Sequence, residues 1–308
     1  MSSSGGTKAV VAALLANAGI AVTKFIAYLL TGSSSMLAES IHSLADAGNQ
    51  VLLLVGGRRA TREATPQHPF GYGRERYIYA FIVSIVLFSV GGLFALYEGV
   101  HKVQHPEGIH KWQWVPLAVL GIGIVLESMS FRTAISEANH LRGGVSWRSF
   151  IRHARAPELP VILLEDFAAL IGLVLALCGV GLTLLTDDGI WDAIGTLCIG
   201  ALLVAVAIVL AIETKSLLLG ESAADVQVEA IAAAILSVAG LDRIIHMRTM
   251  HLGPEELLVA AKVAVGGERS AVQVADAIDE AEASIRSAVP IARVIYLEPD
   301  IDRAGKVA

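Results

Sequence analysis

The chain has 308 residues, of which 55% are hydrophobic and 17% are charged, and its formal net charge at pH 7 is -6. Soluble domains carry fewer hydrophobic and more charged residues, so this composition excludes an ordinary soluble protein. Residues 1–219 carry 15 basic and 15 acidic side chains, whereas residues 220–308 carry 8 basic and 14 acidic ones. The acidic C-terminal part offers no basic stripe to neutralise phosphates, which argues against a nucleic-acid partner.

Six apolar segments are each long enough to cross a bilayer, which takes about 20 helical residues. They lie at residues 8–30, 35–57, 76–100, 113–137, 159–185 and 190–218. We therefore predict an all-α bundle of six transmembrane helices over residues 8–219, after a disordered N-terminus at residues 1–7. Cys178 and Cys198 fall in apolar segments, and we expect small buried side chains rather than a disulfide.

The second apolar segment contains LAESIHSLADAGNQ, in which polar residues recur at helical spacing. His42 and Asp46 are four residues apart, so they project from the same helical face. Glu39 and Asn49 extend this polar stripe one turn in each direction. Because polar groups are costly inside a membrane, such a stripe is expected to be functional and to face a cavity or polar partners.

The fifth segment, LPVILLEDFAALIGLVLAL, carries a second acidic position at Glu165 and Asp166. Imidazole and carboxylate groups suit zinc and related divalent metals, and zinc usually takes four ligands. We predict a metal site from His42, Asp46 and Asp166, with Glu165 or Glu39 as the fourth ligand. An alternative for either glutamate is a structural ion pair with Lys24 in the first segment.

Loop charge predicts the orientation in the membrane. The second and fourth connections hold nine Lys and Arg residues, against two in the first, third and fifth. The even connections and both termini are therefore expected in the cytoplasm. The long fourth connection is either an amphipathic stretch on anionic headgroups or an ordinary basic loop.

The C-terminal part reads as helix, strand, strand, helix, strand. Helical spacing covers residues 222–238 and 270–288, and β-rich runs cover residues 243–251, 256–265 and 291–298. A Gly-Pro turn joins the first two runs. We predict a small α+β domain of the ferredoxin-like kind, in the order αββαβ, as a cytoplasmic domain at residues 220–308.

Three stretches carry a specific resemblance: SSSMLAESIHSLAD, HPFGYGRERY at residues 68–77, and LLEDFAALIGLVLA. Together they resemble the cation diffusion facilitator family of metal/proton antiporters. The resemblance implies a homodimer, formed by the C-terminal domain and the membrane helices, in the cell (inner) membrane. It also implies a transport site on the second and fifth helices, which carries over to His42, Asp46 and Asp166.

The sequence departs from that family at two positions. Zinc-transporting members commonly have HxxxD on both helices, but here Ile162 stands four residues before Asp166. Ile162 cannot bind a metal, so the fourth ligand is missing from its usual place. Tyr72 replaces the second histidine of the loop motif, which argues against an accessory metal site there, and His68 is expected to be structural.

We therefore expect a divalent metal efflux transporter that exchanges metal for protons by alternating access. Zinc is the first candidate, with iron(II), manganese and cobalt behind it, and the metal is a transported substrate rather than a cofactor. A membrane-anchored metal sensor is the main alternative, and metal flux separates the two. An enzyme is not expected, because the HExxH motif of a metalloprotease is absent from the sequence.

Overall fold

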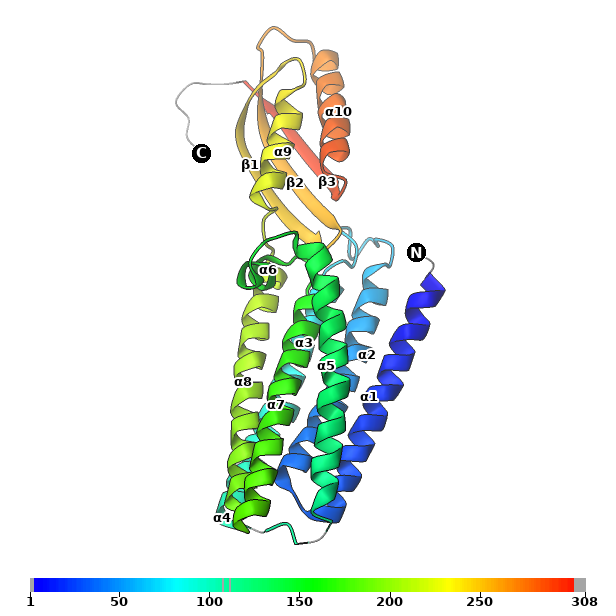
Figure 1. Cartoon of the computed structure of the whole chain (residues 1–308). Coiled ribbons are helices and arrows are strands. Elements are labelled where there is room, and N and C mark those ends of the chain that lie inside the picture. Colours follow the sequence, from blue (N-terminus) through cyan, green and yellow to red (C-terminus); the bar gives the residue numbers. More distant parts are fainter. Residues whose placement is uncertain (1–2, 107, 111, 302–308) are drawn as a thin grey trace. The chain divides into compact units, whose positions relative to one another are not determined.

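The computed structural model describes residues 3–301 except 107 and 111. The chain forms two compact units, one from Met1–Arg58 and Arg76–Lys215 and the other from Arg59–Glu75 and Ser216–Ala308. The first unit is helical, and the second contains the sheet (Figure 1). The connection between the second and third segments, residues 59–75, thus belongs to the C-terminal unit. The expected domain at residues 220–308 did not include it.

Helices make up the first unit, including two short ones of seven residues each, η1 and α6. They are α1 (Ser3–Thr31), α2 (Ser34–Ala60), α3 (Glu75–Val86), the π-helix η1 (Leu87–Leu93), α4 (Phe94–Gln104), α5 (Trp114–Arg142), α6 (Trp147–His153), α7 (Glu158–Thr186) and α8 (Ile190–Leu219). Helix α1 begins at Ser3 rather than at residue 8, because adding residues to an existing helix is easier than nucleating one. Residues 1–2 of the stretch expected to be disordered lie outside the described residues.

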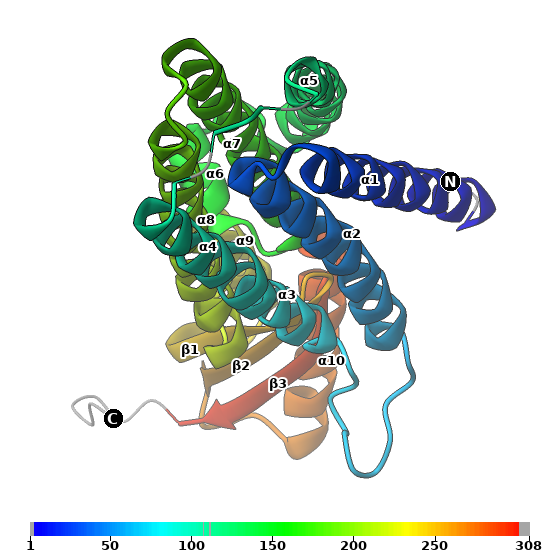
Figure 2. The same cartoon turned by 90° about the horizontal axis from the view of Figure 1, so that it is seen from below.

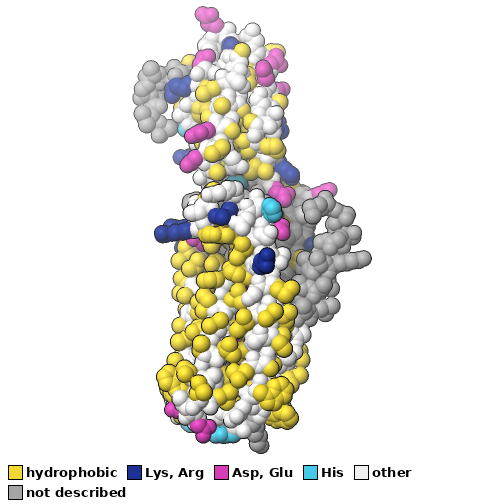
Figure 3. Space-filling model, in the orientation of Figure 1, with side chains coloured by type: hydrophobic (Ala, Val, Ile, Leu, Met, Phe, Trp, Pro, Cys, Tyr) yellow, Lys and Arg dark blue, Asp and Glu magenta, His cyan; other side chains and the backbone are white. Residues whose placement is uncertain are grey.

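Four helices in the described part of the chain are long and apolar enough to span a membrane. They are Glu75–Gln104, which joins α3, η1 and α4, and Trp114–His140, Glu158–Thr186 and Ile190–Leu219. Apolar side chains cover the long middle of this unit on the face shown in Figure 3, and charged side chains gather toward its ends. The full count of six spans stays a prediction.

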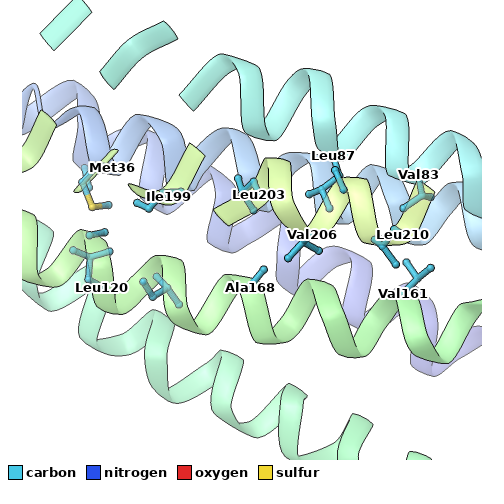
Figure 4. Close-up of a cluster of buried hydrophobic side chains, with 14 of the residues drawn as sticks. Met36, Val83, Leu87, Leu120, Val161, Ala168, Ile199, Leu203, Val206 and Leu210 are labelled. Atoms are coloured by element: carbon cyan, nitrogen blue, oxygen red, sulfur yellow. The ribbon is translucent and has the colours of Figure 1, made fainter. Parts of the chain in front are cut away.

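Buried apolar side chains from several helices form the core of this unit. Met36 of α2, Leu120 of α5, Leu173 of α7 and Ile199 of α8 are each fully buried. Figure 4 shows a part of this cluster, with side chains of α2, α3, α5, α7 and α8 directed toward one another. Figure 2 shows the same helices from below.

Glycines allow the α3–η1–α4 span to approach α8 closely. A Cβ atom on Gly200 of α8 would lie 2.8 Å from the backbone nitrogen of Leu96, and one on Gly92 would lie 2.7 Å from Cγ2 of Val204. Membrane helices pack closely through such small residues, because lipid provides no hydrophobic force between them. The small-residue stretch around Gly91 and Gly92 is therefore a packing surface.

We expect Gly200→Ala to lower the free energy of unfolding in detergent by about 1–3 kcal/mol, because overpacking strains the helices. The added methyl group would meet a backbone atom at this position. The matched control is Gly121→Ala in α5, where the new Cβ would meet nothing within 4 Å. Thermal unfolding of both variants measures the difference. Equal stability of the two variants would contradict the close packing of α4 on α8.

The two cysteines differ from the prediction in one respect. Cys178 and Cys198 are free thiols, but both are exposed on the surface of the helical unit. The expectation of burial was therefore wrong. An apolar segment in a membrane can turn its side chains to lipid as readily as to the protein interior, so hydropathy alone does not identify the buried face.

The C-terminal unit has the predicted order αββαβ. Its elements are α9 (Asp225–Leu236), β1 (Leu241–Gly253), β2 (Glu256–Val265), α10 (Ala271–Ala288) and β3 (Ala292–Asp300). Strand β2 is central, antiparallel to β1 and parallel to β3. Ile231, Ile235 and Ile285 of the two helices are buried in one cluster with Leu257 and Val259 of β2. The ferredoxin-like topology stays a prediction.

A local sequence signal explains where α10 begins. Ser270 and Gln273 form a capping box, in which each residue's side chain accepts from the backbone of the other. The backbone nitrogen of Gln273 donates to Ser270 Oγ at 3.3 Å, and the backbone nitrogen of Ser270 donates to Gln273 Oε1 at 3.0 Å.

A lysine and two acidic residues link β2 to β3. Lys262 of β2 lies 3.1 Å from both Glu298 Oε1 and Asp300 Oδ2 of β3. These hydrogen bonds, first that of Glu298, raise the pKa of Lys262.

The loop at residues 59–75 packs within the C-terminal unit. A Cβ on Gly73 would lie 2.8 Å from the carbonyl oxygen of Leu252 in β1, and Arg74 donates a hydrogen bond to the sulfur of Met250 at 3.2 Å. Within the loop, the rings of His68 and Tyr72 stack with centroids 4.7 Å apart. His68 thus has an aromatic partner here, which agrees with the structural role expected of it.

Candidate metal centre

The polar stripe of α2 faces the interior of the helical unit. Glu39, His42 and Asn49 are at most 1% exposed, and the Asp46 side chain is 15% exposed. Leu44, on another face of the same helix, is 59% exposed. The helix therefore turns its polar residues inward and an apolar side chain outward, as the cost of polar groups in hydrocarbon requires.

His42 and Asp46 retain free ligand atoms. His42 Nε2 lies 3.5 Å from Asp46 Oδ2, which is too long for a strong hydrogen bond. Both ring nitrogens of His42 and Oδ1 of Asp46 lack a hydrogen-bond partner among the described residues. Buried polar atoms are normally satisfied, so these three atoms call for a ligand or water. A divalent metal suits a neutral imidazole beside a carboxylate.

Glu39 lies in a buried ion pair. Lys24 Nζ of α1 is 2.9 Å from Glu39 Oε2 and also donates to Ser43 Oγ at 2.9 Å. Oε1 of Glu39 points toward α7, where a Cβ on Gly172 would lie 2.8 Å from it. The geometry is that of the structural ion pair, one of the two roles that the sequence leaves open for Glu39.

The two acidic residues of α7 have different partners. Glu165 is 5% exposed and its Oε1 accepts a hydrogen bond of 2.7 Å from Asn49 Nδ2 of α2. Asp166 is turned toward α5, where Ser130 Oγ donates to its Oδ2 at 2.9 Å. Asn49 therefore joins α2 to α7, which is the interhelical role expected for an intramembrane amide.

The five predicted ligands share one region but are not assembled into a coordination shell. Asp46 interacts electrostatically with Glu165, Glu127, Lys24 and Asp166. In the part of the chain that the structure describes, however, no three His, Cys, Asp or Glu side chains are placed to hold a metal ion. Glu39, Glu165 and Asp166 each form a hydrogen bond with another side chain of the same protein. Their carboxylates are therefore directed at those side chains and not at a common point. The ligand set stays a prediction.

Ile162 lies one helical turn before Asp166 and is partly buried. It packs against the main apolar cluster and also against a smaller one that contains Ala134, Ala138 and Leu163. An apolar side chain suits this place, so the position where a fourth ligand would be expected is used for packing between α5 and α7.

Sequence reasoning missed two polar residues that act on the site helices. Ser130 holds Asp166, and Asp192 holds the start of α2 through hydrogen bonds to Ser33 and Ser34. Asp192 is an acidic residue in an apolar segment, which was an available signal. Ser130 carried no signal, because a lone serine in a membrane helix usually bonds to its own backbone.

The fold and the site define a polytopic membrane protein with a buried histidine–carboxylate pair between its helices. Residues 10–219 match the model of the cation efflux transmembrane domain. The match covers more than half of the chain. The chain therefore belongs to the cation diffusion facilitator family.

Two relatives are similar over most of this chain. The human protein named proton-coupled zinc antiporter SLC30A9, mitochondrial, is 32% identical over 85% of this chain and 46% of its own length. Metal tolerance protein C4 of Arabidopsis thaliana is 26% identical over 85% of this chain and 57% of its own length. The chain thus spans about half the length of these relatives.

Two shorter similarities lie beside these. The zinc transporter ZitB of Pectobacterium atrosepticum is 30% identical over 39% of this chain and 37% of its own length. The copper form of the MamM C-terminal domain covers 27% of this chain and 91% of that structure, with 15% identity and a TM-score of 0.25.

Proposed function

We propose that this protein is a divalent metal efflux transporter, with zinc as the first candidate substrate, and that it exchanges the metal for protons. The observation that carries the proposal is the buried His42–Asp46 pair, in which three potential ligand atoms have no hydrogen-bond partner among the described residues. Family membership and relatives named as zinc transporters support the same conclusion.

The membrane architecture that we propose has six spans over residues 8–219 and a cytoplasmic domain at residues 220–308. Helix α1 has 29 residues and helix α2 has 27. Both exceed the length of about 20 residues that a bilayer requires. Because the polar stripe of α2 is buried, its low mean hydropathy does not prevent it from spanning. Loop charge supports cytoplasmic termini in a cell (inner) membrane, and family membership supports a homodimer.

The exchange of metal for protons follows from the chemistry of the ligands. Imidazole and carboxylate groups bind metal only when they are deprotonated, so metal and protons compete for them. We propose that His42, Asp46 and Asp166 bind the ion loaded from the cytoplasm, with Glu165 or Glu39 completing the shell. Asp166 would then exchange its hydrogen bond from Ser130 for the metal, and protons entering from the other side would expel the ion.

The decisive experiment is a metal panel in proteoliposomes that contain the full chain and a pH-sensitive dye. Zn²⁺, Fe²⁺, Mn²⁺ and Co²⁺ are tested separately with an imposed proton gradient. We expect Zn²⁺ uptake with reciprocal proton movement. Proton-coupled flux of another metal alone would change the substrate, and flux that ignores the proton gradient would indicate a channel. A protein that binds metal without any flux would be the membrane-anchored sensor.

A further inference from the structure

A buried carboxylate at the start of α8 caps the start of α2. Asp192 is 3% exposed, and Ser33, Ser34 and Ser35 are at most 1% exposed. Asp192 Oδ2 accepts from the backbone nitrogen of Ser34 at 2.7 Å and from its Oγ at 3.1 Å. Asp192 Oδ1 accepts from Ser33 Oγ at 2.9 Å and from the backbone nitrogen of Ser35 at 3.3 Å.

The Asp192 carboxylate supplies hydrogen-bond acceptors for amide groups at the start of α2. The first amide groups of a helix have no acceptor within the helix and carry a partial positive charge. In α2, two of these donors, from Ser34 and Ser35, are buried and are directed at a single carboxylate from another helix. Charge-assisted hydrogen bonds of this kind are stronger than neutral ones.

Further contacts extend this cluster to α7 and along α8. Thr183 Oγ1 of α7 accepts from the backbone nitrogen of Asp192 at 3.0 Å. Thr196 Oγ1 lies 2.9 Å from Ser34 Oγ and 3.2 Å from Ser35 Oγ. A Cβ on Gly195 would lie 3.2 Å from the carbonyl oxygen of Leu175 and 3.4 Å from Cα of Gly179, so the backbones of α7 and α8 approach closely here. The start of α2 is thus bound to α8, and α8 is bound in turn to α7, the helix that carries the acidic pair.

The position of this cluster relates it to the candidate site. His42 lies eight residues after Ser34, about 12 Å along the axis at 1.5 Å per residue. Asn49 and Glu165 join α2 to α7 beyond the site, so α2 is held on both sides of His42. An ion that leaves toward the end where α2 begins must pass a place at which α2, α7 and α8 are bound together.

We propose that Asp192 is a positioning residue for transport: by capping α2 it closes the helical unit at this end and holds His42 and Asp46 in register with α7. This inference rests on the proposed function. The hydrogen bonds that Asp192 accepts from Ser33, Ser34 and Ser35 break and reform in each transport cycle. Asp192 touches no predicted metal ligand and acts through the position of α2.

The test uses the full chain with Asp192→Asn, in which one carboxylate oxygen becomes an amide that cannot accept from the α2 donors. The matched control is Asp188→Asn. Asp188 is an exposed acid in the connection just before α8, and its Oδ1 accepts from the backbone nitrogen of Ile190 at 3.0 Å, so it caps α8 alone. Both changes are made with Cys178→Ala, Cys198→Ala and a reporter cysteine, Met36→Cys. Met36 is fully buried beside the cluster.

The first readout is the rate at which a water-soluble thiol reagent labels the reporter in detergent-solubilised protein. We expect Asp192→Asn to raise this rate about tenfold, which corresponds to about 1.4 kcal/mol in the opening equilibrium. Asp188→Asn should leave it unchanged. Equal labelling of the two variants would overturn the proposal. Because labelling requires no metal, this readout stands even if the protein moves none of the metals in the panel.

The second readout is Zn²⁺ flux in proteoliposomes. If Asp192 holds this end closed, its loss lowers the population of the form that loads metal from the other side, and the apparent KM rises several-fold. Saturating Zn²⁺ restores that form, so kcat changes little. A purely structural role predicts the opposite pattern, with a lower apparent kcat and an unchanged KM, and that pattern would also overturn the proposal.

Discussion

Replacing His42 by alanine is expected to reduce proton-coupled Zn²⁺ flux by more than about 100-fold. Loss of a residue that merely supports a metal ligand costs about 10–100-fold in affinity, and loss of a ligand itself costs at least as much. His42 is 1% exposed and its ring nitrogens have no hydrogen-bond partner among the described residues, so its removal breaks no such bond in the protein. The fold should therefore survive the substitution.

The measurement is Zn²⁺ uptake by proteoliposomes at equal protein content, together with calorimetric Zn²⁺ binding. His140→Ala is the matched control, because His140 is an exposed histidine near the end of α5. Transport by His42→Ala at the wild-type rate and proton stoichiometry would refute the assignment. A variant that fails to migrate as folded protein on gel filtration would instead show that His42 stabilises the helical unit.

The same assay separates the two acids of α7. Asp166→Asn should abolish flux if Asp166 is a ligand. Glu165→Gln keeps an oxygen that can accept the hydrogen bond from Asn49, so it should retain flux if Glu165 serves mainly to join α2 and α7. Loss of flux in both variants would place both residues in the coordination shell, and loss in Glu165→Gln alone would exchange their roles.

The second large effect is expected at the buried ion pair between Lys24 and Glu39. Lys24→Met should destabilise the protein by about 3–5 kcal/mol, because it leaves Glu39 buried without its counter-charge. The double variant Lys24→Met with Glu39→Met should recover most of that loss, since replacing a whole buried pair by apolar side chains is often neutral. Unfolding by SDS titration in mixed micelles measures both.

The double variant also decides whether Glu39 contributes to transport. If Glu39 serves only as the partner of Lys24, the double variant should fold and carry Zn²⁺. If Glu39 completes the metal shell, the double variant should fold and lose flux. A single variant as stable as the wild type would show that Glu39 is already neutral or solvated, contrary to the buried pair in the structure.

Hydropathy and helical spacing predicted the order of the long helices. Long apolar runs show where such a helix lies in the sequence, and a polar stripe shows which of its faces is turned inward. The inward face of α2 follows from the cost of exposing His42 and Asp46 to hydrocarbon. In the C-terminal unit, the capping residue Ser270 and the Gly-Pro turn after β1 marked where elements begin and end. These are local signals, so the sequence contains them fully.

Partners across helices could not be predicted in the same way. Whether Asp166 turns to α2 or to Ser130 depends on the rotation of α7 against α5, and no spacing rule fixes that rotation. Asp192 caps a helix that begins far earlier in the chain, at Ser34. The serines at the start of α2 resemble ordinary caps for their own helix. Such contacts depend on how the helices pack.

The loop at residues 59–75 affects how the C-terminal unit can be studied. The chain passes between the two units at three places, at residues 58–59, 75–76 and 215–216. A fragment that begins at residue 220 would lack the loop that covers Leu252 and Gly253, and it would expose the end of the β1–β2 hairpin. The loop continues directly from α2, so the chain links that helix covalently to the segment that packs on the hairpin. A fluorescent label at the hairpin end would therefore test whether a movement of α2 reaches the C-terminal unit.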